Sequence, residues 1–212
     1  MRSSLPKELK SFINEEKPSS EPMSRQNLRI IRSKKETPDD AETIRRCLEG
    51  DSFAFEAIVE KYRDRVFWTA YHLVLDSEDA RDIAQQSFLK VWTSLKDYDF
   101  GRSFPGWVTR ITANCAIDFL RARKSTEPLP EIAADRSPLD RNLDIRKLFV
   151  RIAPLLSNRR RIVLVLREVQ GMEMSEIAGL LNCTESTVRN LLSQAKEAFR
   201  KKVKELFPEY GV

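Results

Sequence analysis

The sequence predicts an all-α protein of two small helical domains joined by a flexible linker. Three observations lead to this fold class. Apolar residues recur at three- and four-residue steps along most of the chain, and no stretch shows the alternation typical of a strand. Glycine is scarce, with 6 in 212 residues. Three prolines, at positions 128, 130 and 138, interrupt the helical periodicity in one short region and predict the linker.

The composition indicates a soluble globular protein, with 41% hydrophobic and 33% charged residues. No apolar run approaches the roughly 18 residues that a membrane-spanning helix needs. Residues 1–20 lack the apolar core of a signal peptide. We therefore expect the protein to remain in the cytoplasm.

Few residues suit metal binding or catalysis. Cys47, Cys115 and Cys183 are far apart and form no CxxC pair, so we expect reduced, half-buried side chains. His72, the only histidine, has no neighbours at metal-ligand spacing and is expected at a helix surface or boundary. The sequence therefore predicts no metal, no cofactor and no catalytic residues.

Charge is distributed unevenly. Residues 38–100 carry eight basic and fourteen acidic side chains, a net charge of −6. Residues 101–124 carry five against one, and residues 147–212 carry twelve against seven, so their net charges are +4 and +5. A local basic excess is expected of a protein that touches nucleic acid with selected faces.

The first predicted elements follow a tail. Residues 1–37 contain nine basic and five acidic residues and few large apolar ones, which predicts a disordered basic tail. A short helix is expected over residues 39–50, ending at Gly50. Ser52 is expected to cap the next helix, whose apolar stripe comprises Phe55, Ile58, Val59, Tyr62, Val66, Ala70 and Leu73.

The helix predicted over residues 77–95, capped by Ser77, has two faces. One is a core stripe made of Ala80, Ile83, Ala84, Phe88, Val91, Trp92 and Leu95. The other is a polar strip that contains a leucine and comprises Asp82, Gln85, Gln86 and Leu89. An ordinary solvated face would more often carry scattered lysines and glutamates. The strip therefore suggests a protein-docking surface, and a solvated face is the alternative.

A basic helix is predicted over residues 105–123, after a loop over residues 97–106. One of its faces is expected to be the core and comprises Trp107, Val108, Ile111 and Cys115. Another carries Arg110, Asn114, Ile117 and Arg121 at steps of four, three and four residues. Amide and guanidinium groups on one line can bind the bases and phosphates of DNA.

The second domain is expected to begin at Ser137 and Pro138, which resemble a helix start. Further along, Ile177, Ala178 and Leu181 mark a short helix, and residues 182–184 form a tight turn at Asn182. A second helix follows, which Thr184 can cap and whose apolar stripe comprises Val188, Leu192, Ala195 and Phe199. This pattern predicts a helix-turn-helix, whose second helix enters the DNA major groove. Opposite its apolar stripe lie Glu185, Ser186, Arg189, Asn190, Ser193 and Gln194.

Several literal strings resemble one family. Residues 82–92, Asp-Ile-Ala-Gln-Gln-Ser-Phe-Leu-Lys-Val-Trp, resemble the polymerase-binding helix of small bacterial sigma factors, the extracytoplasmic-function (ECF) group of the sigma-70 family. Residues 107–114 resemble the segment of that family that captures the melted minus-ten element. Residues 167–171, 175–178 and 186–189 resemble its promoter-reading domain. The resemblance covers about residues 40–206 in the family's order.

The resemblance implies three domains or segments after the tail: sigma region 2 over residues 38–124, a linker over 125–138, and sigma region 4 over 139–212. It assigns the docking strip to core RNA polymerase. It implies that minus-ten DNA is bound by Trp107, Arg110, Asn114 and Arg121, and that Asn114 lies at the pocket for a flipped base. Minus-35 contacts fall on Ser186, Thr187, Arg189, Asn190, Ser193 and Gln194.

The implied function is promoter-specific initiation with RNA polymerase core, and members of this group are commonly inhibited by an anti-sigma factor. The chain departs from the family at Leu191 and Gln194, where arginines are usual, and at Glu173, where a capping Ser or Thr is common. These departures put the strength of the upstream DNA contact in doubt. A free-standing helix-turn-helix regulator is the alternative, and a hydrolase or nuclease is disfavoured because phosphate-loop and metal motifs are missing.

Overall fold

The computed structural model describes residues 38–124, 149 and 151–207, and all regular secondary structure in these residues is helical. Contacts divide the chain into two compact units, residues 1–120 and 121–212, and each is described by itself. The predicted tail, the predicted linker and the predicted helix start at Ser137 lie outside the described residues. Within the described residues, no helix is long and apolar enough to cross a membrane.

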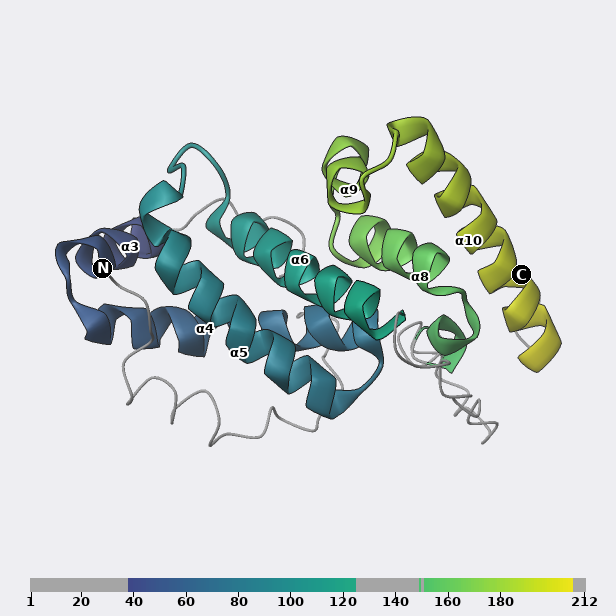
Figure 1. Ribbon diagram of the computed structural model, residues 1–212, viewed down its shortest axis with the longest axis horizontal. Coiled ribbons are helices and arrows are strands. Elements are labelled where there is room, and N and C mark those ends of the chain that lie inside the picture. The colour runs from purple at the N-terminus through teal and green to yellow at the C-terminus, as the bar shows by residue number, and fades with distance from the viewer. Residues whose placement is uncertain (1–37, 125–148, 150, 208–212) are drawn as a thin grey trace. The chain divides into compact units, whose positions relative to one another are not determined.

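In the described residues of the first unit, four helices follow each other along the chain (Figure 1). They are α3 (Pro38–Glu49), α4 (Ser52–Val74), α5 (Ser77–Ser94) and α6 (Phe104–Lys124), with a short 3-10 turn, η1 (Leu95–Asp97), after α5. Helix α6 continues past the boundary of the first unit at residue 120. The four predicted helices of this region are confirmed.

Helices α4 and α5 are capped by aspartates, each of which lies one residue before the serine predicted as the cap. The Asp51 carboxylate accepts hydrogen bonds from the backbone N–H groups of Phe53 and Ala54, at 3.0 and 3.2 Å. The Asp76 carboxylate caps α5 in the same way, at 2.9 and 3.0 Å. The predicted caps, Ser52 and Ser77, were therefore wrong by one position. A carboxylate one residue upstream competes well because it is charged and favoured by the helix dipole.

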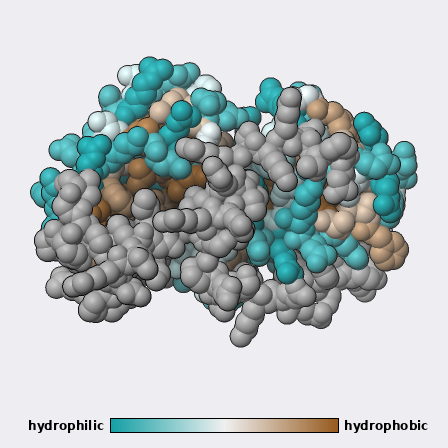
Figure 2. Space-filling view, turned by 180° about the vertical axis from the view of Figure 1, so that it is seen from behind, coloured by the Kyte–Doolittle hydropathy of each residue, from teal (hydrophilic) through white to brown (hydrophobic). Residues whose placement is uncertain are grey.

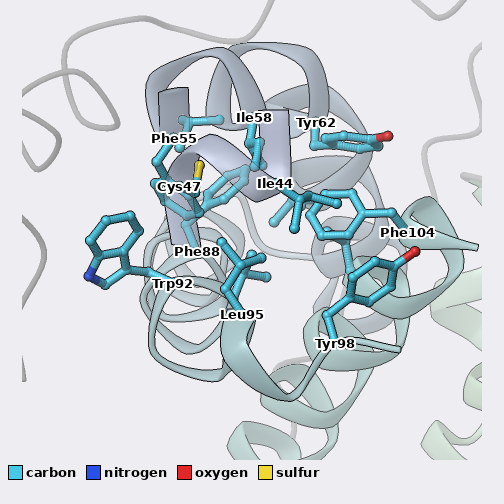
Figure 3. Close-up of a cluster of buried hydrophobic side chains, with 14 of the residues drawn as sticks. Ile44, Cys47, Phe55, Ile58, Tyr62, Phe88, Trp92, Leu95, Tyr98 and Phe104 are labelled. Atoms are coloured by element: carbon cyan, nitrogen blue, oxygen red, sulfur yellow. The ribbon is translucent and has the colours of Figure 1, made fainter. Parts of the chain in front are cut away.

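All four helices contribute to one hydrophobic core (Figure 3). Its largest fully buried side chains include Phe55 from α4, Phe88 from α5 and Phe104 from α6. Phe55 meets Trp92 edge to face, with ring centroids 4.9 Å apart. The apolar stripe predicted for α5 is confirmed, since all seven of its residues are buried. This burial fixes the opposite side of α5 as an outward face.

An ion pair between an exposed lysine and a buried aspartate fastens α3 to α4. The Asp40 carboxylate, 5% exposed, accepts hydrogen bonds from the Lys61 ammonium at 2.6 Å and the Tyr62 hydroxyl at 2.9 Å. A buried carboxylate needs such donors, because without them its desolvation would oppose folding. Asp40 therefore sets the position of α3 on the core.

His72 lies among aromatic rings near the end of α4. Its imidazole centroid is 5.9 Å from that of Trp68 and 6.2 Å from that of Tyr71. Burial disfavours the charged imidazolium and lowers the pKa of His72 from 6.5 to about 4. The side chain is half-buried, which agrees with the predicted boundary position.

Acidification is expected to destabilise the first unit through His72. Between pH 6.5 and 4 the imidazole is protonated in the unfolded chain but neutral in the folded one. The free energy of unfolding therefore falls as the pH falls through this window. Between pH 7 and 5 the loss should be about 1–2 kcal/mol. Urea unfolding of wild type and His72→Phe at both pH values measures it. Parallel pH dependences in the two proteins would contradict the assignment.

In the described residues of the second unit, short helical segments and one long helix, α10, surround the predicted turn. They are η2 (Ala153–Leu155), α8 (Asn158–Leu164), a π-helical turn η3 (Val165–Val169), α9 (Met174–Leu181) and α10 (Glu185–Leu206). Ile162, Val163 and Leu166, which recur at helical spacing in this stretch, are buried and form its core face. Gly171 ends this stretch with a φ of 69°, a conformation that glycine adopts without strain.

The helix-turn-helix is confirmed. Asn182 ends α9 in the left-handed region, with φ 50° and ψ 52°. The Thr184 hydroxyl then caps α10 by accepting a hydrogen bond from the Thr187 backbone N–H at 3.2 Å. At the start of α9, the Glu176 carboxylate accepts from the backbone N–H of Glu173, at 3.1 Å. A glutamate one turn into the helix thus satisfies the Glu173 amide at this start.

Candidate functional site

The polar strip of α5 lies on its outward face. Asp82 and Gln86 are exposed, and Gln85 and Leu89 are half-buried. The aspartate cap and the buried apolar stripe hold the helix backbone, so these four side chains have a fixed direction. On the face shown in Figure 2, most described side chains are hydrophilic and hydrophobic ones occupy smaller areas. The strip is an amide- and carboxylate-bearing surface on a rigid helix.

Leu89 belongs partly to the interior. Its side chain packs against the hydrophobic core, and its backbone carbonyl accepts a hydrogen bond from the Thr93 hydroxyl at 3.0 Å. The leucine that marked the predicted docking strip therefore has a structural role as well. The exposed chemistry of the strip comes mainly from Asp82 and Gln86.

The basic face of α6 is only partly as predicted. Arg110, Asn114 and Arg121 are exposed along the helix. Ile117, placed by periodicity between them, is 2% exposed, so its prediction as a surface residue was wrong. Packing covers this branched aliphatic side chain, whose exposure to water would be unfavourable. The exposed line is therefore entirely polar.

Other side chains of α6 face the core or their own helix. Val108 and Cys115 are buried, and Trp107 and Ile111 are half-buried, which confirms the predicted core face. The Trp107 ring lies 5.2 Å from Tyr98 and 5.7 Å from Phe104, measured between centroids. Only part of the indole is therefore available to a ligand.

The loop before α6 contributes residues that sequence reasoning missed. The Asp99 carboxylate accepts a hydrogen bond from the Gly101 backbone N–H at 2.9 Å, and the Tyr98 hydroxyl donates to the Arg102 carbonyl, so the loop is ordered. Phe100 is 41% exposed, and the Arg45 guanidinium lies 5.7 Å from its ring centroid. The sequence signal for this residue was an aromatic side chain in a loop. The contact itself could not be predicted from the loop, because the arginine partner comes from α3.

The outward face of α10 is polar near its start. The exposed side chains are Glu185, Ser186, Arg189, Asn190, Ser193 and Gln194. The predicted apolar stripe is confirmed on the other side, where Val188, Leu192 and Ala195 are buried and Phe199 is half-buried. The helix therefore presents hydrogen-bonding groups along its first three turns.

Three of the predicted DNA-binding side chains already have partners within this unit. The Thr187 hydroxyl lies 2.9 Å from that of Thr184. Arg189 donates to the Glu185 carboxylate at 3.0 Å. The Gln194 amide oxygen accepts from Arg160 at 3.3 Å. The exposed pairs of Arg189 and Gln194 are weak enough to exchange for a ligand, because water screens them.

The charges near the helix-turn-helix include one buried arginine. Arg161 is 4% exposed and donates to the Asn158 side-chain oxygen at 2.9 Å. Burial lowers the pKa of Arg161 to about 10, so the guanidinium stays charged at neutral pH. Within the part of the chain that the structure describes, no group of His, Cys, Asp and Glu side chains could hold a metal ion.

Two family models match this chain. Residues 58–126 match sigma-70 region 2, and residues 146–199 match sigma-70 region 4. The first match includes α5 and α6 with their exposed polar faces. The second includes the helix-turn-helix and α10 up to residue 199.

Curated relatives are similar over most of their length. The ECF RNA polymerase sigma factor SigW of Bacillus subtilis is 29% identical over 179 residues, which cover 77% of this chain and 96% of SigW. The RNA polymerase sigma-H factor of Pseudomonas aeruginosa is 28% identical, with 80% and 96% covered. The ECF RNA polymerase sigma-E factor of Escherichia coli strain K12 is 27% identical, with 79% and 95% covered.

Solved structures share the fold. The structure of CnrH in complex with the cytosolic domain of CnrY matches with a TM-score of 0.53 and 21% identity, covering 79% of this chain and 98% of that one. The sigma factor RpoE, crystallised with the anti-sigma factor NepR from Bartonella quintana, matches with a TM-score of 0.56 and 18% identity. That match covers 71% of this chain and 96% of RpoE.

Proposed function

This chain is an ECF RNA polymerase sigma factor of the sigma-70 family, and from this premise we propose which of its side chains bind polymerase and which bind promoter DNA. As a member of the family it binds RNA polymerase core and directs promoter-specific transcription initiation. The observation that carries the proposal is the presence of separate exposed polar faces on α5, α6 and α10, each fixed by a buried opposite face.

Core polymerase binds the strip of α5. Asp82 and Gln86 provide the exposed carboxylate and amide, while Gln85 and Leu89 complete the surface from half-buried positions. Polymerase subunits are large proteins, and a helix face with a few anchoring polar groups suits a protein interface. The acidic surroundings of this helix would repel DNA, which supports a protein rather than a nucleic-acid partner.

Minus-ten DNA binds the exposed line of α6. Arg110 and Arg121 contact phosphates, Asn114 hydrogen-bonds the edge of an unpaired base, and Trp107 supplies a partly exposed ring at the start of the helix. Binding to unpaired bases offsets the free energy of unpairing, so the protein needs no nucleotide hydrolysis to open the duplex. We assign the protein no enzymatic activity of its own.

Minus-35 DNA binds the first turns of α10. Ser186, Arg189, Asn190 and Ser193 face outward and can reach base edges or phosphates in the major groove. Thr187 and Gln194, which have partners within the unit, contribute after exchanging them. Leu191 and Gln194 stand where arginines are usual in the family, so this helix offers fewer charged contacts to minus-35 DNA.

The domains act together through the proposed linker. Region 2 spans residues 38–124, the linker 125–138 and region 4 139–212, which lets the two DNA elements be bound at once. The relative RpoE was crystallised with an anti-sigma factor, and we extend this kind of inhibitory partner to the present chain. The protein acts in the cytoplasm, where its polymerase and promoters are.

The test is core-dependent initiation. Core RNA polymerase, the purified protein and an end-labelled promoter library should give transcripts with a defined start. A free-standing helix-turn-helix regulator would bind duplex DNA without core and produce no start of its own. The protein should also co-purify with core polymerase, and a lack of both results would contradict the proposal.

Arg189→Ala and Asn190→Ala are each expected to weaken upstream promoter discrimination by about 1–3 kcal/mol. The effect at Arg189 should lie at the low end, because the Glu185 carboxylate competes for its guanidinium in the free protein. Initiation from promoters with intact and altered minus-35 elements measures the effect. Lys201→Ala, an exposed change near the other end of α10, is the control. Equal discrimination in all proteins would remove these two residues from the contact.

A further inference from the structure

The turn between α3 and α4 exposes two large apolar side chains. Among the described residues only Leu48, Phe53 and Phe100 are exposed large hydrophobics, and the first two flank this turn with exposures of 37% and 75%. Neither is used by the polymerase and promoter assignments above. A largely exposed phenylalanine on one side of a turn, with a second exposed apolar side chain on the other side, indicates a contact surface.

The turn holds Phe53 outward by a set of defined bonds. The Gly50 backbone N–H donates to the Cys47 carbonyl at 3.2 Å, and the Asp51 N–H donates to the Arg46 carbonyl at 3.0 Å. The Arg46 guanidinium also pairs with the Asp51 carboxylate at 2.6 Å. Ala54 and Phe55, the next two residues, are buried in the core. The exposure of Phe53 is therefore a property of an ordered helix start.

The surroundings of this turn are acidic. Residues 38–60 contain seven acidic and two basic side chains, a net charge of −5. Both basic residues, Arg45 and Arg46, already pair with acids of this region. Glu49 and Glu60 are exposed and Glu56 is half-buried. A partner for this surface must therefore combine apolar side chains with positive charge.

The chain itself carries such a segment. Residues 25–35, Arg-Gln-Asn-Leu-Arg-Ile-Ile-Arg-Ser-Lys-Lys, contain five basic and no acidic residues, together with Leu28, Ile30 and Ile31. Their net charge of +5 matches the −5 of residues 38–60 in size. The segment combines the two properties that the surface requires.

The segment can also reach the turn. Ile31 lies seven positions before Pro38, and an extended chain of that length spans about 23 Å. Along α3 the distance from Pro38 to Leu48 is about 15 Å, at about 1.5 Å per residue. Because the segment is tethered next to the surface, its effective concentration there is high, and modest affinity suffices.

We propose that residues 25–35 dock in cis on the α3–α4 face, defined here as Leu48, Phe53 and the acidic residues Glu49, Glu56 and Glu60. Ile30 and Ile31 cover the two apolar side chains, and the arginines and lysines pair with the glutamates. The proposal is independent of the polymerase and promoter contacts. It gives the region N-terminal to the family matches a binding surface within the same chain.

Paramagnetic broadening in the full-length, 15N-labelled protein tests the proposal. A nitroxide is attached at Ser33→Cys in a Cys183→Ser background, where Cys47 and Cys115 are 0% and 2% exposed and escape labelling. Amides of residues 45–57 should lose intensity, and those of α10 should not. Broadening should diminish in about 0.5 M NaCl, where screening acts over a few ångströms. It should also diminish in Phe53→Ser and in the tail variant Arg29→Glu with Arg32→Glu.

Matched controls separate the alternatives. A nitroxide at Ser3→Cys lies well before the basic segment and should leave residues 45–57 at nearly full intensity. Equal broadening from both positions, or broadening of α3 and α4 that survives Phe53→Ser and the tail variant, would overturn specific docking. Broadening that also appears when nitroxide-labelled protein without 15N is mixed with unlabelled 15N-enriched protein would assign the surface to a second copy and overturn docking in cis. No broadening, with weaker polymerase binding by Phe53→Ser, would assign it to polymerase instead.

Discussion

Asp82→Arg combined with Gln86→Ala is expected to weaken binding of core RNA polymerase by at least about 2 kcal/mol, or about thirtyfold in Kd. Both side chains are exposed on α5, and neither supports the core. The change reverses one charge and removes one amide at the centre of the proposed interface. The binding loss should carry over to initiation, because promoter opening requires the assembled holoenzyme.

The fold should survive this double substitution. The Asp76 cap and the buried apolar stripe hold α5 independently of its outward face. An unchanged melting temperature and helix content would confirm this. Arg81→Gln is the matched control, since Arg81 is exposed on the same helix but about 100° away from Asp82 around its axis. Fluorescence titration with core polymerase measures all three proteins, and wild-type affinity in the double variant would refute the assignment of the strip.

Asn114→Ala is expected to slow promoter opening at least tenfold while sparing core binding and closed-complex formation. The Asn114 amide is exposed on α6, one turn after Arg110. Only melted DNA presents the base edge to which this amide would hydrogen-bond. Removing the amide should therefore slow the opening step and not the earlier binding steps. Permanganate reactivity of unpaired thymines on a linear promoter follows opening directly.

A mismatched template sharpens this test. A promoter premelted across the minus-ten element no longer requires unpairing, so it should restore part of the activity of Asn114→Ala. The loss that remains on this template measures the contact with the base itself. Asp118→Asn, an exposed change one turn later on α6, should leave opening close to wild type. Full opening of the linear promoter by Asn114→Ala would show that the base pocket lies elsewhere.

Much of the fold could be predicted because helices are local structures. The stripe from Ala80 to Leu95 follows the 3.6-residue period, and its burial on one side of α5 follows from that period. Asn182 and Thr184 adopted the predicted turn and cap for equally local reasons, since one tolerates positive φ and the other accepts a hydrogen bond from the next turn. The exposure of Arg110, Asn114 and Arg189 followed in the same way.

Other features needed the packed structure. The sequence predicted Ser52 and Ser77 as caps, and only the backbone path at each helix start shows that Asp51 and Asp76 take this role instead. Periodicity placed Ile117 among polar residues on an outward face, yet packing buries it. The contact of Arg45 with Phe100 joins residues from different elements and has no local signal.

The sequence by itself determined the helical fold class, the helix-turn-helix and the family. Helical periodicity, turn chemistry and motif order depend on residues that are close together in the chain. Tertiary structure alone decided the exceptions to that periodicity, such as Ile117, which is buried although its neighbours along the helix line are exposed. Leu89 illustrates the difference, since it lies in the polar strip by sequence and against the core in space. Exposure depends on what packs over a residue from distant parts of the chain, and a helical period cannot specify that partner.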